Sequence, residues 1–267
     1  MVNSLRVLTD RLPERMRSRL RSTYARIAHF GFRFKCPFCK ARVRAFLPFG
    51  LPFAVLKEKH VVGSGIRQNA LCPICFAIDR HRLLYLFLLN KTNIFTAPTK
   101  LLHVAPEPAV SEILRRLPNV DYLSADLCPK NVMVAMDITA IQYPNENFNA
   151  IICNHVLGNV GDDRRAFSEI MRTLKPGGWA ILQVPIARKL KQTYEDFSIT
   201  TQADREQAFG EGFQVRLYAE DYQERLRAAG FIVEVFNWWD EPEKFGGREN
   251  SFALNQEESV YLVRKAN

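Results

Sequence analysis

The sequence predicts an α/β protein with a doubly wound, seven-stranded, mostly parallel sheet, preceded by a small cysteine-containing module and a basic amphipathic helix. Strand and helix patterns alternate from Leu101 onward, two C-x-x-C pairs lie before that region, and arginines line a helical pattern at the N-terminus. A chain of 267 residues can bury one sizeable core and still carry a small second module. We therefore predict a helix over residues 1–31, a module over 32–98 and a larger domain over 99–267.

Residues 4–30 have a helical pattern, because leucines, Met16, Tyr24 and Ile27 recur at steps of three and four. Gly31 is the predicted end of this helix. Six arginines lie between Arg6 and Arg21. A basic amphipathic helix can lie on an anionic membrane surface or against nucleic acid, or it can pack its apolar side on its own protein.

Charge divides the chain in the same way. Residues 1–98 hold 18 Lys and Arg against 4 Asp and Glu, whereas residues 99–267 hold 19 against 24. A basic region favours acidic partners such as nucleic acid or anionic lipid, although it can also be a solvated surface without a partner. No apolar run approaches the roughly 20 residues of a membrane span, and no signal core is recognisable. We expect a cytoplasmic protein, with peripheral attachment to the inner face of the membrane as one alternative.

Two C-x-x-C pairs, "CPFCK" and "CPICF", are separated by 32 residues between Cys39 and Cys72. Two such turns can supply the four thiolates of a closed tetrahedral zinc site. The predicted ligands are Cys36, Cys39, Cys72 and Cys75. The intervening "ARVRAFL" and "HVVGSG" segments have strand patterns, as in a zinc ribbon. A site with four cysteines leaves no open coordination position, so this zinc would be structural; redox chemistry or disulfides are the alternatives.

The elements of the larger domain follow from periodicity. A helix at residues 79–90 ("DRHRLLYLFLLN") precedes "KTNIFTAPTK", which is predicted to be a linker. Strands are predicted at residues 101–104, 122–125, 133–136, 149–153 and 179–184, and in the closing segments "FIVEVF" and "SVYLVRK". Helices are predicted at residues 110–117, 163–174 and 220–229. This alternation indicates a parallel sheet that is covered on both faces.

Four segments of this domain resemble the class I S-adenosylmethionine-dependent methyltransferases, in the order found in that family. They are "HVAPE" (103–107), a glycine-free variant of the nucleotide-binding turn, "SADL" (124–127), "AMDITAIQYPNENFNAIICNHVL" (135–157) and "LKPGGWAILQVP" (174–185). The resemblance is clear over roughly residues 99–190. It implies a Rossmann-like methyltransferase domain that binds S-adenosylmethionine at the carboxyl ends of the strands.

The resemblance also implies the cofactor-binding residues. Asp126 takes the position of the acid that binds the ribose, and Asp137 that of a residue that accepts from the adenine amino group. Glu107 either meets the cofactor's ammonium group or caps the following helix. The further predicted contacts are His103, Ala105, Leu127, Ile138 and Asn154. His155 is the candidate general base, with a structural histidine as the alternative.

The acceptor is predicted to lie against the segment 193–222, which follows the fifth strand of the domain. The candidate contacts are Tyr194, Glu195, Arg216 and Tyr218. A small-molecule or glycoconjugate acceptor, such as an envelope saccharide or a lipid-linked intermediate, is one hypothesis. The alternatives are a zinc-ribbon protein that binds or methylates RNA, and a non-catalytic binding protein on this fold. The last is raised by Asn149 and Gly158, where the chain departs from the family pattern.

Overall fold

The computed structural model describes residues 23–267, and its main feature is a seven-stranded sheet with the order β14-β15-β10-β9-β6-β7-β8. All neighbouring pairs from β8 to β10 are parallel, whereas β15 is antiparallel to both β10 and β14. The predicted fold class is confirmed. The strands are β6 (Thr99–Val104), β7 (Val120–Asp126), β8 (Val134–Ala135), β9 (Phe148–Cys153), β10 (Leu174–Ile181), β14 (Ile232–Asn237) and β15 (Ser259–Arg264).

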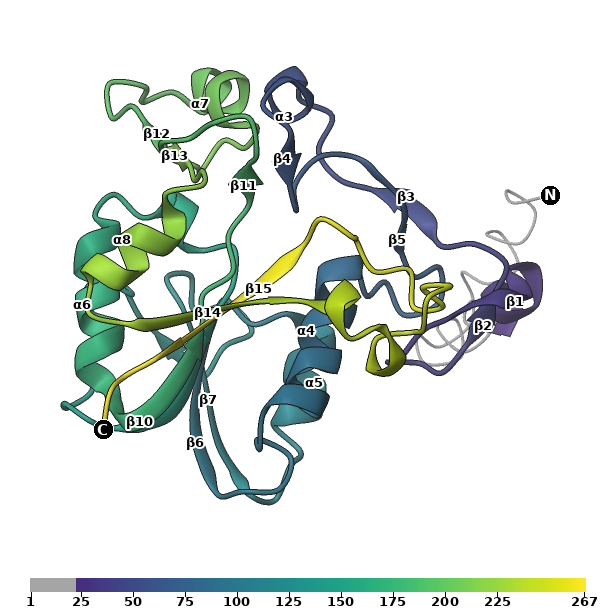
Figure 1. Cartoon of the computed structure of the whole chain (residues 1–267), viewed down its shortest axis with the longest axis horizontal. Coiled ribbons are helices and arrows are strands. Elements are labelled where there is room, and N and C mark those ends of the chain that lie inside the picture. Colours follow the sequence, from purple (N-terminus) through teal and green to yellow (C-terminus); the bar gives the residue numbers. More distant parts are fainter. Residues whose placement is uncertain (1–22) are drawn as a thin grey trace, which may run out of the picture.

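Helices cover both faces of this sheet (Figure 1). Helices α6 (Asp163–Thr173) and α8 (Tyr222–Ala228) bury their apolar side chains in one core cluster with residues of β9 and β10. Helices α4 (Asp79–Lys91) and α5 (Pro108–Leu114) contribute to a second cluster, which contains residues of β6, β9 and β15. The alternating side chains of each strand thus enter two separate cores, as expected for a doubly wound sheet.

Some element bounds differ from the prediction. The strand predicted at 133–136 is reduced to the two residues of β8, because it pairs only with β7 at the edge of the sheet and Met133 is exposed. Helix α5 begins at Pro108, whose fixed φ suits a first helical position. The segment predicted as a linker is ordered at Ile94, which is fully buried in the core beside α4.

The N-terminal module consists of short antiparallel pairs. Strand β1 (Phe30–Lys35) pairs with β2 (Arg42–Val43), and β3 (Leu47–Phe49) pairs with β5 (Arg67–Leu71). Gly31 was predicted to end the N-terminal helix, but residues 23–28 are helical and Gly31 lies inside β1. A Cβ at Gly31 would come within 2.5–2.6 Å of Arg44, so the glycine permits close packing of the two strands. Most of the predicted basic helix lies outside the described residues.

The N-terminal half is joined to the sheet domain through a long-range strand pair. Strand β4 (Val61–Val62), from the "HVVGSG" segment, does not belong to the cysteine module's pairs but pairs with β11 (Ile186–Ala187). Helix α3 (Ala54–Glu58) lies before β4 and next to α7 (Gln202–Phe209), as Figure 1 shows. A further pair joins β12 (Tyr194–Glu195) to β13 (Arg216–Leu217). Within residues 23–267, single-turn 3₁₀ helices also occur at Leu157–Asn159, Trp238–Asp240 and Pro242–Lys244.

Candidate active site and metal centre

The four predicted cysteine ligands converge on one point. All four Sγ atoms lie within 4.8 Å of one another, with 3.6 Å between Cys36 and Cys75 and 3.8 Å between Cys39 and Cys72. A tetrahedral zinc with Zn–S bonds of about 2.3 Å requires Sγ–Sγ separations of about 3.8 Å. The donor set and its spacing therefore fit zinc. The remaining cysteines lie elsewhere: Cys128 is exposed, and Cys153 is the last residue of β9 and is buried in the core.

The two C-x-x-C turns have the same backbone conformation. The amide of Lys40 donates to the carbonyl of Cys36, and the amide of Phe76 donates to the carbonyl of Cys72. Lys40 and Phe76 both have a left-handed backbone, with φ of 58° and 60°. Each turn thus brings its two thiols to the same side of the chain. This repetition follows from the repeated C-P-x-C sequence and could be anticipated from it.

A cavity of about 1200 Å³ lies at the carboxyl ends of β6, β7 and β9. Six of the predicted site residues line it: Ala105, Asp126, Leu127, Asp137, Ile138 and His155. The strand order reverses between β6 and β9, which is the place where open α/β sheets bind their ligands. Two of the residues that line the cavity have left-handed backbones, Ala105 with φ of 46° and His155 with φ of 57°. Such conformations cost free energy and are concentrated at functional sites.

The two predicted cofactor acids each use one oxygen to shape a turn. Oδ1 of Asp126 accepts from the amide of Cys128 at 2.9 Å, and Oδ1 of Asp137 accepts from the amide and hydroxyl of Thr139 at 2.8 Å. The hydrogen bonds among residues 23–267 leave Oδ2 of both carboxylates available. Both acids line the same cavity, so a ligand could be held between them.

Three other predicted cofactor residues form a buried network behind the turn after β6. Nε2 of His103 lies 2.8 Å from Oε2 of Glu107, and Nδ2 of Asn154 donates to Oε1 of Glu107 at 2.9 Å. Nδ1 of His103 contacts the hydroxyl of Tyr122 at 3.0 Å. Burial opposes ionisation, but the hydrogen bonds and charges around Glu107 outweigh it and lower the pKa of this carboxyl to about 2. Glu107 occupies the N-cap position of α5, but its side chain makes no capping hydrogen bond there. The network stabilises the glycine-free turn.

His155 lies two residues beyond β9 and is the candidate base. Its side chain is 14% exposed and lines the cavity, and its amide donates to the carbonyl of Gln183 at 2.7 Å. Burial lowers the pKa of His155 well below its ordinary value, and the charge of Arg80 lowers it further. The imidazole is therefore neutral at physiological pH, which is the form that can accept a proton.

Comparison with known proteins agrees with this geometry. Residues 116–182 match a family model described as a methyltransferase domain. This part of the chain is therefore similar to a methyltransferase domain. The match agrees with the resemblance to methyltransferases seen in the sequence, and the matched residues include β7, β9, α6 and β10.

Solved structures with a similar fold include the YcgJ protein from Bacillus subtilis, at 14% identity and a TM-score of 0.44, covering 69% of this chain and 99% of that chain. Another is an S-adenosylmethionine-dependent methyltransferase from Mesorhizobium loti, at 14% identity and a TM-score of 0.43, covering 63% of this chain and 92% of that chain. No curated protein matches the chain.

The predicted acceptor residues of the methyltransferase domain divide into two groups. Arg216 and Tyr218 are each 1% exposed. Arg216 donates to the carbonyls of residues 157, 160 and 161, and the Tyr218 hydroxyl donates to Asp163 at 2.8 Å. Glu195 lies 3.5 Å from Arg216 in an ion pair. These contacts hold the segment after β10 onto the turn at residues 157–161 and the first residue of α6, which is a structural role that their spacing in the sequence does not reveal.

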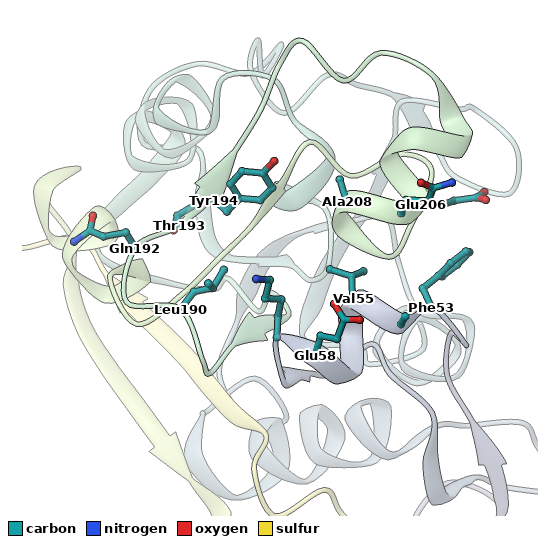
Figure 2. Close-up of a pocket in the computed structure, with 12 residues that line it drawn as sticks. Phe53, Val55, Glu58, Leu190, Gln192, Thr193, Tyr194, Glu206 and Ala208 are labelled. Carbon is teal, nitrogen blue, oxygen red and sulfur yellow. The ribbon is translucent and has the colours of Figure 1, made fainter.

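Tyr194 lies in a different place from the other acceptor candidates. Its side chain is 41% exposed and lines a second cavity of about 750 Å³ between α3 and α7. Figure 2 shows Val55 and Glu58 of α3 on one side of this cavity and Ala208 of α7 on the other. Arg205 of α7 lines the first cavity instead, so α7 borders both. Residues 53–59 and the segment after β10 therefore enclose this second cavity together.

Sequence analysis missed two buried polar residues at the same edge of the sheet. Nε2 of Gln183, two residues after β10, donates to Oε1 of Glu258 at 2.9 Å. Glu258 directly precedes β15 and its side chain is 4% exposed. Because β15 is antiparallel to β10, its first residue lies at the carboxyl ends of the parallel strands. An acidic residue just before a closing antiparallel strand was therefore the signal that could have indicated Glu258.

Proposed function

We propose that this protein transfers the methyl group of S-adenosylmethionine to a polar acceptor, and that the cofactor binds in the 1200 Å³ cavity. The observation that supports this most is the convergence of Asp126 and Asp137 on one cavity at the strand-order reversal, within the segment that matches the methyltransferase model. The oxygens of Asp126 suit the ribose hydroxyls, and those of Asp137 suit the adenine amino group. Ala105 would lie near the methionine part, supported from behind by Glu107.

The decisive experiment is titration calorimetry with S-adenosylmethionine and S-adenosylhomocysteine. We expect Asp126→Ala to weaken the affinity about tenfold or more, because a hydrogen bond to a charged group contributes roughly 1.5–3 kcal/mol. Asp121→Ala is the matched control, since Asp121 is exposed at the opposite end of the same strand. Equal affinities for the two variants, or no binding by the wild type, would contradict the assignment of the cavity.

We also propose that the four cysteines hold one structural zinc ion. All four coordination positions are taken by thiolates, so the metal would stabilise the module and would not contact the acceptor. The methyl-transfer site would then depend on the module only through the residues that pack against it, such as those of α4 and β4.

The acceptor is proposed to be a neutral small molecule or glycoconjugate, such as an envelope saccharide or a lipid-linked intermediate. The cavity beside Tyr194 supports this class, because it combines an apolar floor at Val55 and Leu190 with carboxylates at Glu58 and Glu206. Its volume of about 750 Å³ lies within the range for small-molecule sites. RNA is the second candidate, on the ground that residues 1–98 carry the positive charge of the chain.

The N-terminal arginines are proposed to attach the protein to an anionic membrane surface. We expect deletion of residues 1–22 to lower binding to phosphatidylserine vesicles by more than about tenfold at low salt, since each basic residue contributes about 1 kcal/mol near such a surface. Binding to uncharged phosphatidylcholine vesicles is the control, and vesicle sedimentation is the measurement. No helix among residues 23–267 is long and apolar enough to cross a membrane. Unchanged vesicle binding after the deletion, or tighter binding to RNA than to vesicles, would contradict this proposal.

A further inference from the structure

The carboxyl ends of the strands behind the cavity carry two buried polar atoms without a hydrogen-bond partner among the described residues. Nε2 of His155 and Oε2 of Glu258 are both shut off from solvent and unpaired among the described residues. Nε2 of His155 lies 4.0 Å from the other oxygen of Glu258, Oε1. An unpaired buried polar atom destabilises a fold, so such a pair has to be explained.

Three neighbouring strands place this pair. His155 follows β9, Gln183 follows β10 and Glu258 precedes β15, and these strands are adjacent in the sheet. Gln183 holds Oε1 of Glu258 through its side-chain amide at 2.9 Å. The backbone carbonyl of Gln183 also accepts a hydrogen bond from the backbone amide of His155 at 2.7 Å. Gln183 therefore fixes both members of the pair relative to each other.

The segment that follows β4 packs directly against the pair. Gly63 has a left-handed backbone with φ of 95°, and a Cβ there would lie 3.2 Å from Oε1 of Glu258 and 3.3 Å from Cε1 of His155. The carbonyl of Gly63 is held by Arg80 at 3.1 Å. Only a residue without a side chain fits over the pair in this way.

The two ring nitrogens of His155 have different surroundings. Nε2 is occluded on the side of Glu258, whereas Nδ1 is not among the occluded atoms and makes no hydrogen bond among the described residues. His155 lines the cavity that holds Asp126 and Asp137. The imidazole thus stands between the cavity and the carboxyl of Glu258.

We propose that Glu258 is a positioning residue that keeps the proton of the neutral His155 ring on Nε2, so that Nδ1 accepts the proton of an O–H or N–H acceptor during methyl transfer. This inference rests on the proposed function. It deepens that function, because it restricts the acceptor to a neutral nucleophile that must lose a proton. A hydrogen bond of this kind can be long in a free enzyme and shorten when the site is filled.

The charge balance of the step agrees with this arrangement. In methyl transfer the acceptor atom bonds to the methyl carbon, the carbon–sulfur bond breaks with its electron pair going to sulfur, and the acceptor's proton leaves. Nδ1 of His155 takes that proton, and the ring becomes an imidazolium. The positive charge is then next to the carboxylate of Glu258, which stabilises it, and the proton later passes to solvent.

Other titratable groups lie near enough to the pair to affect its titration. They are Arg67 of β5 and Asp79, Arg80 and His81 of α4. Burial and the charge of Asp79 raise the pKa of Glu258 to about 7, although both arginines lower it. Asp79 is bonded to Arg67 at 2.6 Å and its pKa is lowered, and burial lowers the pKa of His81 to about 4. Glu258 is therefore the member of this group that changes charge near neutral pH.

Nitrogen NMR of ¹⁵N-histidine-labelled protein tests the inference, with His155→Gln used to assign the signal. We expect the neutral His155 ring to carry its proton on Nε2, and the Nε2 shift to have an inflection near pH 7 as Glu258 ionises. Glu258→Gln should remove the inflection. Glu257→Gln, the same change at the preceding residue, should keep it, because Glu257 is exposed and pairs with His60 at 3.0 Å. Gln183→Leu should move the inflection to higher pH, since the hydrogen bond of Gln183 lowers the pKa of Glu258.

A proton on Nδ1, a flat Nε2 shift between pH 6 and pH 8, or equal effects of the two glutamate variants would overturn the inference. S-adenosylhomocysteine binding is measured on the same samples to separate this from the proposed function. Binding by wild type and Glu258→Gln within about twofold shows a folded site, so a flat shift would then remove only the role of Glu258. No binding by the wild type would remove the proposed function and the inference with it.

Discussion

Cys72→Ser is expected to abolish zinc binding and to unfold the N-terminal module. Cys72 is fully buried in a cluster with Phe34 and Phe46, and its Sγ lies 3.8 Å from that of Cys39. In small zinc domains the free energy of metal binding, about 10–16 kcal/mol, is also folding free energy. A serine hydroxyl does not replace a thiolate ligand, so most of this stabilisation would be lost.

Elemental analysis of protein purified without added metal is the first measurement, with one zinc per chain expected for the wild type and none for the variant. Hydrogen exchange of residues 30–78 should show the loss of protection in the module. Cys128→Ser is the control, because Cys128 is exposed and away from the cluster. A wild type that is folded without zinc, or a variant that keeps its zinc, would show that the four thiols have another role.

Arg82→Met is expected to destabilise the whole protein by about 3 kcal/mol or more, because each buried acceptor left without a donor costs about 1–3 kcal/mol. The Arg82 side chain is fully buried and its guanidinium uses all five N–H donors. The acceptors are the carbonyls of Asn69, Ala70, Ala77, Phe252 and Ala253, at 2.8–3.1 Å. Methionine would remove a donor from each of these carbonyls, although that of Ala77 would keep another bond, from the amide of Cys72 at 3.0 Å.

Thermal and urea unfolding measure the effect of this substitution. Arg82→Lys should lie between the wild type and Arg82→Met, because the ammonium keeps the charge but has only three donors. Arg115→Met is the control, since Arg115 is 56% exposed and pairs only with Glu112 of the preceding turn. We expect less than about 0.5 kcal/mol there. An equally small effect at Arg82 would mean that water replaces the lost donors.

The Arg82 contacts have a consequence for how the chain is organised. The acceptors at residues 69, 70 and 77 belong to the cysteine module, whereas those at 252 and 253 belong to the loop before β15. Ala253 also packs in the apolar cluster around the cysteines. Together with the β4–β11 pair, these contacts couple the module to the sheet domain. Loss of zinc should therefore affect the position of Gly63 and Arg80 above the candidate site.

Local patterns in the sequence were sufficient for the alternating strands and helices, the two cysteine turns and the acids at the strand ends. The reason is that each depends on a few consecutive residues. Burial on both faces makes the second half of β6 and of β9 almost entirely apolar, and the C-P-x-C repeat produces the same turn twice. Asp126 and Asp137 were found because each lies at or just after the end of its strand, and these strand ends meet at one cavity.

Only the tertiary structure placed the residues that act across long separations. Glu258 lies 103 positions after His155 in the numbering, yet adjacent strand ends bring their side chains to 4.0 Å. Arg216 and Tyr218 are residue types that often contact ligands, but the packing of β13 against the 3₁₀ turn at Leu157–Asn159 leaves both of them buried. Val61 and Val62 were predicted to belong to a zinc ribbon, but in the structure they pair with β11. Strand pairing and burial depend on which distant segments meet, and hydrophobic periodicity along the chain does not contain that information.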